Sequence, residues 1–228
     1  MNLTFEALRP EYEELWDTIN RPGGLTRVPE TMREAEAIMA PDAKARFEAV
    51  ELRTGVPWFV TGIVLTREAG SPPNFHAWLH NGDPMFDHNG TARQTVNVPA
   101  RRPPDPAVSW EDGAVDAYEI EGLLDRNDWS PALVAWLLEK FNGFGYRLYH
   151  RVRSPYVWGA TAVQQRGKYT ADRVWDPTVT DPQIGGMALL AALIRRKPEI
   201  RNQMSGNQES GNQESGVRPD TRPPTPDA

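Results

Sequence analysis

VPWFVTGIVLTREAG, residues 56–70, is the most apolar stretch of the chain. Pro57 stands where the first turn of a helix tolerates proline, and the residues after it place apolar side chains on nearly every face of that helix. A helix that is apolar all round is buried on all sides, so we expect it at the centre of the fold. Its apolar run ends at Arg67 and Glu68, and the sequence AGSPP (69–73) stops it.

The segments on either side of this stretch also have helical patterns. Between residues 74 and 106 the pattern changes to turns, with a β-like alternation at 93–98 and a proline-rich crossing after it. We therefore predict an α+β fold, predominantly α, in which helices surround a small β-hairpin lobe. The further helices are expected at 11–20, at 30–54 with a break at Pro41, and at 110–124, 130–141 and 181–195.

Composition narrows the class of protein. The 228 residues carry 25 basic and 31 acidic side chains, and a formal net charge of −6 disfavours a general electrostatic attraction to nucleic acid or anionic lipid. No run of eighteen apolar residues is present, and residues 1–14 lack the apolar segment of a secretory signal. We expect a soluble protein that is made in the cytoplasm and does not insert into membranes. The absence of cysteine excludes disulfides, thiol catalysis and Cys-ligated zinc.

The C-terminal part differs in composition from the rest. Residues 202–216 read NQMSG, NQESG, NQESG, and residues 217–228 are rich in Pro, Asp, Arg and Thr. Neither piece can bury enough apolar surface to offset the entropy lost on ordering. The sequence therefore predicts a single catalytic domain over 1–201 and a flexible tail over 202–228.

Glu68 is the first candidate for chemistry. It is an acid on the last turn of the most apolar helix, where desolvation and the negative end of the helix dipole both favour the protonated carboxyl. A carboxylic acid that stays neutral near pH 7 is what glycoside hydrolysis requires as its general acid. The alternative is a simple surface ion pair with Arg67 or Arg93.

The second carboxylate is expected in the predicted hairpin lobe. Asp83 lies in the tight turn HNGDP (80–84), at the entry to the lobe, and Asp87 is its nearest substitute. Gln94 and Thr95 follow on the predicted strand and could orient a water molecule. A lobe Asp that faces a helix-end Glu across an open cleft favours the wider carboxyl spacing, so we expect an inverting hydrolase.

Aromatic residues and glycines gather in a third region. The segments LEKFNGFGYR (138–147), SPYVWG (154–159) and GKY (167–169) combine rings, hydrogen-bonding groups and glycines that allow a ligand to approach the backbone. Such combinations are typical of a saccharide groove. The candidate substrate-binding residues are Gln94, Phe141, Asn142, Tyr146, Tyr156, Trp158 and Tyr169.

Several of these motifs together carry a family resemblance over about residues 55–193. The string GVPWFVTGIVLTREAG, LHNGDPM, RQTVNVP, WEDGAVDA, LEKFNGFGYR, SPYVWGAT, GKYTAD resembles the lysozyme-like peptidoglycan hydrolases found as phage endolysins and as bacterial lysozyme-family proteins. It is more distantly similar to goose-type lysozymes and lytic transglycosylases. The sequence DHNG (87–90) departs from the pattern as a short insertion, which leaves the second carboxylate open between Asp83 and Asp87.

The resemblance implies a lysozyme-like fold and cleavage of the glycan between N-acetylmuramic acid and N-acetylglucosamine. It implies Glu68 as the acid and Phe141, Asn142 and Tyr146 near the substrate. We expect a monomer that needs no metal or other cofactor, binds peptidoglycan glycan strands and acts on the cell wall after release. If the protein is phage-encoded, a holin-like partner would export it. Whether the product is hydrolysed or an anhydro-sugar is left open by the sequence.

Two other functions compete with this one. His76 and His80 stand at i and i+4 with Asp83, Asp87 and His88 nearby, a spacing that could serve a metal-dependent wall peptidase or amidase. The other alternative is a non-catalytic wall-binding or virion module that keeps the aromatic groove, because binding and cleavage use the same lining.

Overall fold

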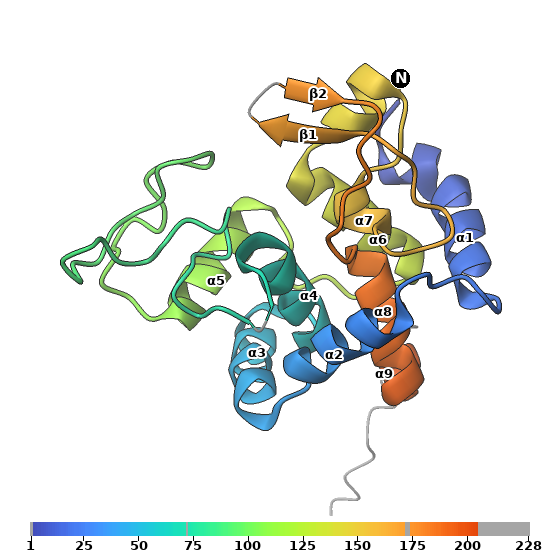
Figure 1. Ribbon diagram of the computed structural model, residues 1–228. Helices are drawn as coiled ribbons and strands as arrows, with labels where there is room; N and C mark the ends of the chain where they lie inside the picture. The colour runs from blue at the N-terminus through green and yellow to red at the C-terminus, as the bar shows by residue number, and fades with distance from the viewer. Residues whose placement is uncertain (1, 72, 172–173, 205–228) are drawn as a thin grey trace, which may run out of the picture.

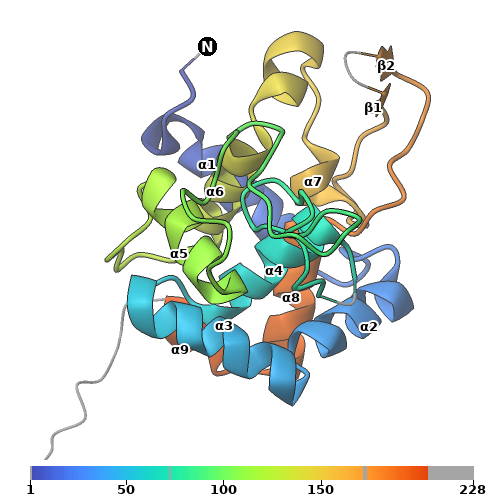
Figure 2. The same cartoon turned by 90° about the vertical axis from the view of Figure 1, so that its left-hand side faces the viewer.

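The protein is known here from a computed structural model, which describes residues 2–71, 73–171 and 174–204 (Figures 1 and 2). Most of the described chain is helical, with one small antiparallel sheet, which confirms an α+β fold that is predominantly α. The elements in chain order are α1 (Phe5–Asn20), α2 (Val28–Ile38), α3 (Pro41–Thr54), α4 (Trp58–Ala69), α5 (Trp110–Ile120), α6 (Pro131–Asn142), the π-helical turn η1 (Tyr146–His150), α7 (Pro155–Trp158), β1 (Lys168–Ala171), β2 (Val174–Asp176), α8 (Gly186–Arg196) and α9 (Ile200–Met204).

Helix α4 lies at the centre, as its sequence predicts. Every residue from Trp58 to Arg67 is buried, and the helix packs against α2, α3 and α8. Gly62 permits the close approach, because a Cβ atom there would lie 2.4 Å from Cγ2 of Ile38. Helix α8, buried from Gly186 to Ile194, packs on both α4 and α6 and joins the two sides of the core.

The prediction placed the β-hairpin in the wrong segment of the chain. The segment 70–109 consists of turns and isolated bridges, and its described residues contain no strand, including the expected one at 93–98. The sheet is formed instead by β1 and β2, with Tyr169 opposite Trp175. Figure 1 shows the two as separate projections, the 70–109 segment at the left and the hairpin at the top. The 93–98 alternation has no core to face, since Val96 and Val98 are 64% and 89% exposed.

The ordered domain also extends further than predicted. Helix α9 continues to Met204, and both Ile200 and Met204 are buried against the core. Residues 202–204 therefore belong to the fold and not to a tail. The remainder of the predicted tail, 205–228, lies outside the described residues.

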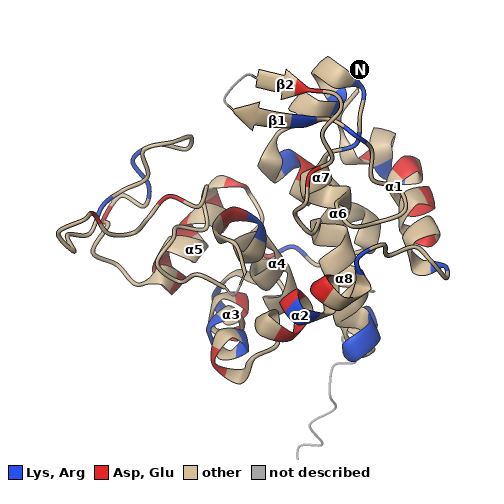
Figure 3. Ribbon diagram, viewed as in Figure 1, with Lys and Arg blue, Asp and Glu red and all other residues tan. Residues whose placement is uncertain are grey.

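The surface carries mixed charge. In the ribbon of Figure 3, acidic and basic positions alternate along α3, whereas α1 is mostly acidic. Across the described ranges, no helix is long and apolar enough to cross a lipid bilayer.

Candidate active site

The Glu68 carboxyl lies at the C-terminal end of α4, in contact with α7. The Tyr156 hydroxyl donates a hydrogen bond of 2.6 Å to Glu68 Oε1. Burial raises the pKa of Glu68 to about 7, and the Tyr156 hydrogen bond and the Arg67 charge offset only part of that effect. Near neutral pH this acid is therefore divided between its protonated and ionised forms, which is the condition a proton donor needs.

Arg67 does not pair with Glu68, contrary to the ion-pair alternative. Its guanidinium lies over the Tyr156 ring, 4.7 Å from the centroid. It donates to the Ile184 carbonyl oxygen at 2.7 Å and to Gln183 Oε1 at 3.0 Å. In the described part of the chain, no salt bridge joins Glu68 to a basic residue.

The turn at residues 80–84 packs directly on the backbone of Glu68. Gly82 has a φ of +75°, and a Cβ atom at this position would lie 2.3 Å from the Glu68 carbonyl oxygen. Hydrogen bonds from Gly82 N to Trp78 O, 2.9 Å, and from Trp78 N to Asp83 O, 2.8 Å, close the turn. The turn that holds Asp83 is thus fixed against the backbone at the end of α4.

The Asp83 carboxylate is hydrogen-bonded to residues of its own segment, 70–109. It accepts hydrogen bonds from the backbone N–H of Val96 (2.7 Å) and of Asn97 (2.8 Å), and from the side-chain amides of Asn97 (2.7 Å) and Asn81 (3.1 Å). Burial alone would raise the pKa of Asp83, but these hydrogen bonds outweigh it and hold the pKa below the ordinary value. Asp83 is therefore ionised at neutral pH and fastens residues 96–97 to the turn.

Asp87 forms a separate turn further along the lobe. Its Oδ1 accepts from the backbone N–H of Asn89 at 2.8 Å and of Thr91 at 2.9 Å. These contacts are those of a turn-forming aspartate. They give Asp87 a local role in the 87–91 turn.

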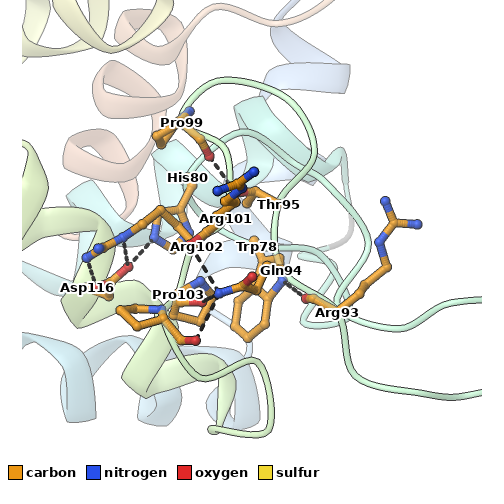
Figure 4. Close-up of polar contacts among 11 residues, drawn as sticks. Trp78, His80, Arg93, Gln94, Thr95, Pro99, Arg101, Arg102, Pro103 and Asp116 are labelled. Carbon is orange, nitrogen blue, oxygen red and sulfur yellow. Dashed lines mark hydrogen bonds and ion pairs between the residues drawn. The ribbon is translucent and has the colours of Figure 1, made fainter.

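Gln94 and Thr95 close the same lobe, as Figure 4 shows. The Gln94 side-chain nitrogen lies within hydrogen-bond distance of three carbonyl oxygens between residues 101 and 104. The Thr95 hydroxyl donates to the Pro99 carbonyl and accepts from the Arg102 N–H. These groups hold the 95–104 segment together, and the Thr95 hydroxyl has both a donor and an acceptor partner inside the loop.

His80 belongs to a polar cluster behind the turn. Its Nε2 lies 2.8 Å from Asp116 Oδ2, and Arg102 also pairs with Asp116 (Figure 4). Burial lowers the pKa of His80 although the Asp116 hydrogen bond opposes this. Within the described ranges, no three His, Asp or Glu side chains gather as metal ligands would. The Asp116 carboxylate thus engages one ring nitrogen of His80, behind the turn that packs on Glu68.

The two aromatic residues of α7 face different surroundings. Trp158 is fully buried and packs over Tyr12 with 6.4 Å between ring centroids, so it has no surface with which to contact a glycan. Tyr156 is 6% exposed and directs its hydroxyl to Glu68. The structure therefore places Trp158 in the core and Tyr156 beside the acid, although the sequence groups both with the substrate-binding residues.

The FNG motif at the end of α6 lies at the surface. Phe141 is partly buried against the core. Asn142 is exposed and donates from Nδ2 to Ser154 Oγ at 3.0 Å, which ties the end of α6 to the start of α7.

Tyr146 of η1 and Tyr169 of β1 belong to an aromatic cluster between η1 and the hairpin. Their ring centroids lie 5.3 Å apart, and Trp175 contacts both rings. His150 stacks on Trp175 at 3.6 Å with an interplanar angle of 2°, and its Nε2 lies 2.7 Å from the Tyr169 hydroxyl. Sequence patterns alone did not point to His150 and Trp175. Trp175 could be placed beside Tyr169 only if the sequence first predicted the 168–176 hairpin, in which the two residues stand opposite each other.

A buried ion pair anchors η1, which carries Tyr146 and His150. Glu139 of α6 is fully buried and accepts two hydrogen bonds from Arg147, at 3.0 and 2.9 Å, and one from the Tyr12 hydroxyl at 2.6 Å. Arg147 also pairs with Glu11 at 2.7 Å. The aromatic cluster is thereby attached to both α6 and α1.

No protein-family model matches the chain, and neither a curated protein nor a solved structure shows significant similarity to it.

Proposed function

We propose that this protein is a peptidoglycan glycan-strand hydrolase, a muramidase of the endolysin type, in which Glu68 is the general acid. The observation that carries the proposal is the position of the Glu68 carboxyl. It ends the buried helix α4, accepts a hydrogen bond from Tyr156, and has the turn of Gly82 packed on its backbone. An acid held in this way near its neutral form suits the protonation of a leaving sugar oxygen.

The reaction follows from that role. The protonated Glu68 gives its proton to the glycosidic oxygen between N-acetylmuramic acid and N-acetylglucosamine as the bond from C1 to that oxygen breaks. A water molecule then adds hydroxide to C1 and releases its remaining proton, and the Glu68 carboxylate takes up a proton from solvent before the next cycle. The net change is the addition of one water across one glycosidic bond.

Asp83 contributes negative charge in this scheme. It is ionised and adjacent to Gly82, so it is suited to stabilise positive charge that develops on the sugar ring. Its four hydrogen bonds make it a poor base for activating water. The predicted inversion depends on a second carboxylate acting as that base, so the stereochemistry of the product tests this part of the proposal.

Tyr146 and Tyr169 are the side chains we propose for sugar stacking, and we propose the exposed Asn142 as a further substrate contact. Part-exposed rings fixed by an anchored turn are suited to the apolar faces of pyranose units. We further propose that the protein acts as a monomer on the wall after release, through a holin-like pore if a phage encodes it.

Digestion of purified peptidoglycan, followed by mass analysis of the fragments, tests the function. We expect reducing muramic acid ends, and we expect Glu68→Gln to lower the rate by at least about 100-fold while the protein stays folded. Glu51→Gln is the matched control. Glu51 is another acid with a raised pKa, but it accepts a hydrogen bond from Trp58 N at the opposite end of α4.

Three outcomes would contradict the proposal in different ways. A folded Glu68→Gln variant with near-normal activity would remove Glu68 from the mechanism. Anhydro-muramic products would replace hydrolysis by a transglycosylase reaction. Binding to the wall without any cleavage would favour the non-catalytic wall-binding module.

A further inference from the structure

The two oxygens of the Glu68 carboxyl have different surroundings. Oε1 accepts the 2.6 Å hydrogen bond from the Tyr156 hydroxyl. Among the residues that the structure describes, Tyr156 is the only hydrogen-bond donor to this carboxyl. In a neutral carboxyl group, one oxygen is a carbonyl that accepts and the other carries the proton. A donor at Oε1 therefore makes Oε1 the carbonyl oxygen and leaves the proton on Oε2.

Tyr156 remains a donor over the working pH range. Burial and the nearby Glu68 charge both raise the pKa of its hydroxyl well above the ordinary value. The hydroxyl proton is therefore retained at any pH at which Glu68 titrates. The Tyr156 hydroxyl can therefore donate to Glu68 at every pH in that range.

Arg67 fixes the ring of Tyr156. Arg67 is 9% exposed, and its guanidinium covers the ring at 4.7 Å, a distance typical of a cation–π contact. Two of its nitrogens are fixed by Ile184 O and Gln183 Oε1, in the segment that leads into α8. Arg67 is the chain neighbour of Glu68, yet its charged group lies against the tyrosine instead of against the carboxylate.

We propose that Tyr156 and Arg67 are positioning residues of the acid: the Tyr156 hydroxyl holds Oε1 of Glu68 as an acceptor, Arg67 fixes the tyrosine ring, and Oε2 is thereby the oxygen that delivers the proton to the sugar. This inference rests on the proposed function. It assigns Tyr156 to the acid and not to the substrate.

The charged and titratable groups around this pair define what a substitution would change. Tyr118 of α5 lies within electrostatic range of Tyr156, and its hydroxyl donates a hydrogen bond to Thr61 Oγ1 at 3.0 Å. Glu34 of α2 and Tyr146 of η1 lie within electrostatic range of Arg67. Of all these groups, Tyr156 and Arg67 act directly on Glu68, and both lower its pKa against the larger effect of burial.

Tyr156→Phe is the decisive variant, because it removes one oxygen atom and keeps the ring beneath Arg67. Loss of the hydrogen bond removes a contribution that lowers the pKa of Glu68, so the pKa should rise. The Glu68 carboxyl is followed by ¹³C NMR of glutamate-labelled protein between pH 4 and 9, with Glu68→Gln identifying its signal. Activity on purified peptidoglycan is measured over the same pH range.

We expect Tyr156→Phe to move the Glu68 titration, and the alkaline limb of the pH–rate profile with it, to higher pH. We also expect a loss of about tenfold in kcat at the optimum with KM unchanged, because the proton is no longer confined to Oε2. Tyr118→Phe is the matched control: it removes a buried hydroxyl of the same kind that does not bond to Glu68, and both profiles should stay in place.

An unchanged or lowered Glu68 titration in Tyr156→Phe, with an active wild-type enzyme, would overturn the positioning role alone. A Tyr156→Phe variant with a raised KM and an unchanged kcat would overturn it as well, since these changes would mark a substrate contact. Failure of the wild-type protein to hydrolyse any peptidoglycan would instead overturn the proposed function, and proton delivery with it.

Discussion

Glu68→Gln should change how folding stability depends on pH. Burial raises the pKa of this carboxyl from 4.5 to about 7. Below pH 4.5 Glu68 is protonated in both the folded and the unfolded chain, so its contribution to stability is fully present. As the pH rises from 4.5 to 7 the unfolded chain ionises first, and this favours unfolding. Above pH 7 both states are ionised and the loss is complete.

The expected magnitude follows from the separation of the two pKa values. A gap of about 2.5 in pH corresponds to about 3 kcal/mol of unfolding free energy. Urea unfolding of the wild type and of Glu68→Gln at a series of pH values between 4 and 8 measures it. The wild type should lose about 3 kcal/mol relative to the Gln variant over this range.

Subtraction of the two profiles cancels the effect of the other titrating groups, including Glu34 and Glu51, whose pKa values burial also raises. Parallel profiles, with a difference between the two proteins that stays constant to within about 1 kcal/mol, would refute the reasoning. Such a result would mean that Glu68 is well solvated, and it would remove the physical basis for Glu68 as the acid whatever the activity of the variant.

Two further pairs of variants test the 70–109 segment, which packs on Glu68. Gly82→Ala should lower the unfolding free energy by about 2 kcal/mol more than Gly90→Ala. Both positions have positive φ, but only at Gly82 would the new Cβ meet the Glu68 carbonyl oxygen. Equal losses in urea unfolding would show that the backbone near Gly82 shifts to relieve this contact at no cost. Asp83→Ala should lower the unfolding free energy by about 2–4 kcal/mol, because it leaves two backbone N–H groups without their acceptor. Asn97→Ala should lower it by about 1 kcal/mol. If the two variants unfold at the same urea concentration, Asp83 does not hold residues 96–97 to the turn.

The helical part of the fold could be predicted from the sequence because its signals are local. Pro41 separates α2 from α3, and the apolar run after Pro57 marks α4 as central. The sheet could not be located in the same way. Strands of four and three residues carry little pattern, and the more regular alternation at 93–98 belongs to a loop whose hydrogen bonds come from Gln94 and Thr95.

The candidate site divides in the same way between local and long-range signals. Glu68 stands out because one segment holds both the acid and the apolar helix that desolvates it. Its partner Tyr156 is 88 positions away, so no local pattern connects them. Tyr156 and Trp158 are both aromatic residues on the short helix α7, so the sequence does not distinguish their roles. Only the packing of α7 places Tyr156 against Glu68 and Trp158 in the core.

The close packing at Gly62 limits how the protein can change over evolution. A side chain at this position would displace Ile38 of α2 or push α4 along its axis. Glu68 lies six residues further along the same rigid helix, about 9 Å away, so a shift at Gly62 is transmitted to the acid nearly undiminished. Substitutions that enlarge the α2–α4 contact should therefore both strain the core and move the Glu68 carboxyl relative to Tyr156. Compensating changes are expected as pairs, with a smaller residue at position 38 accompanying a larger one at position 62.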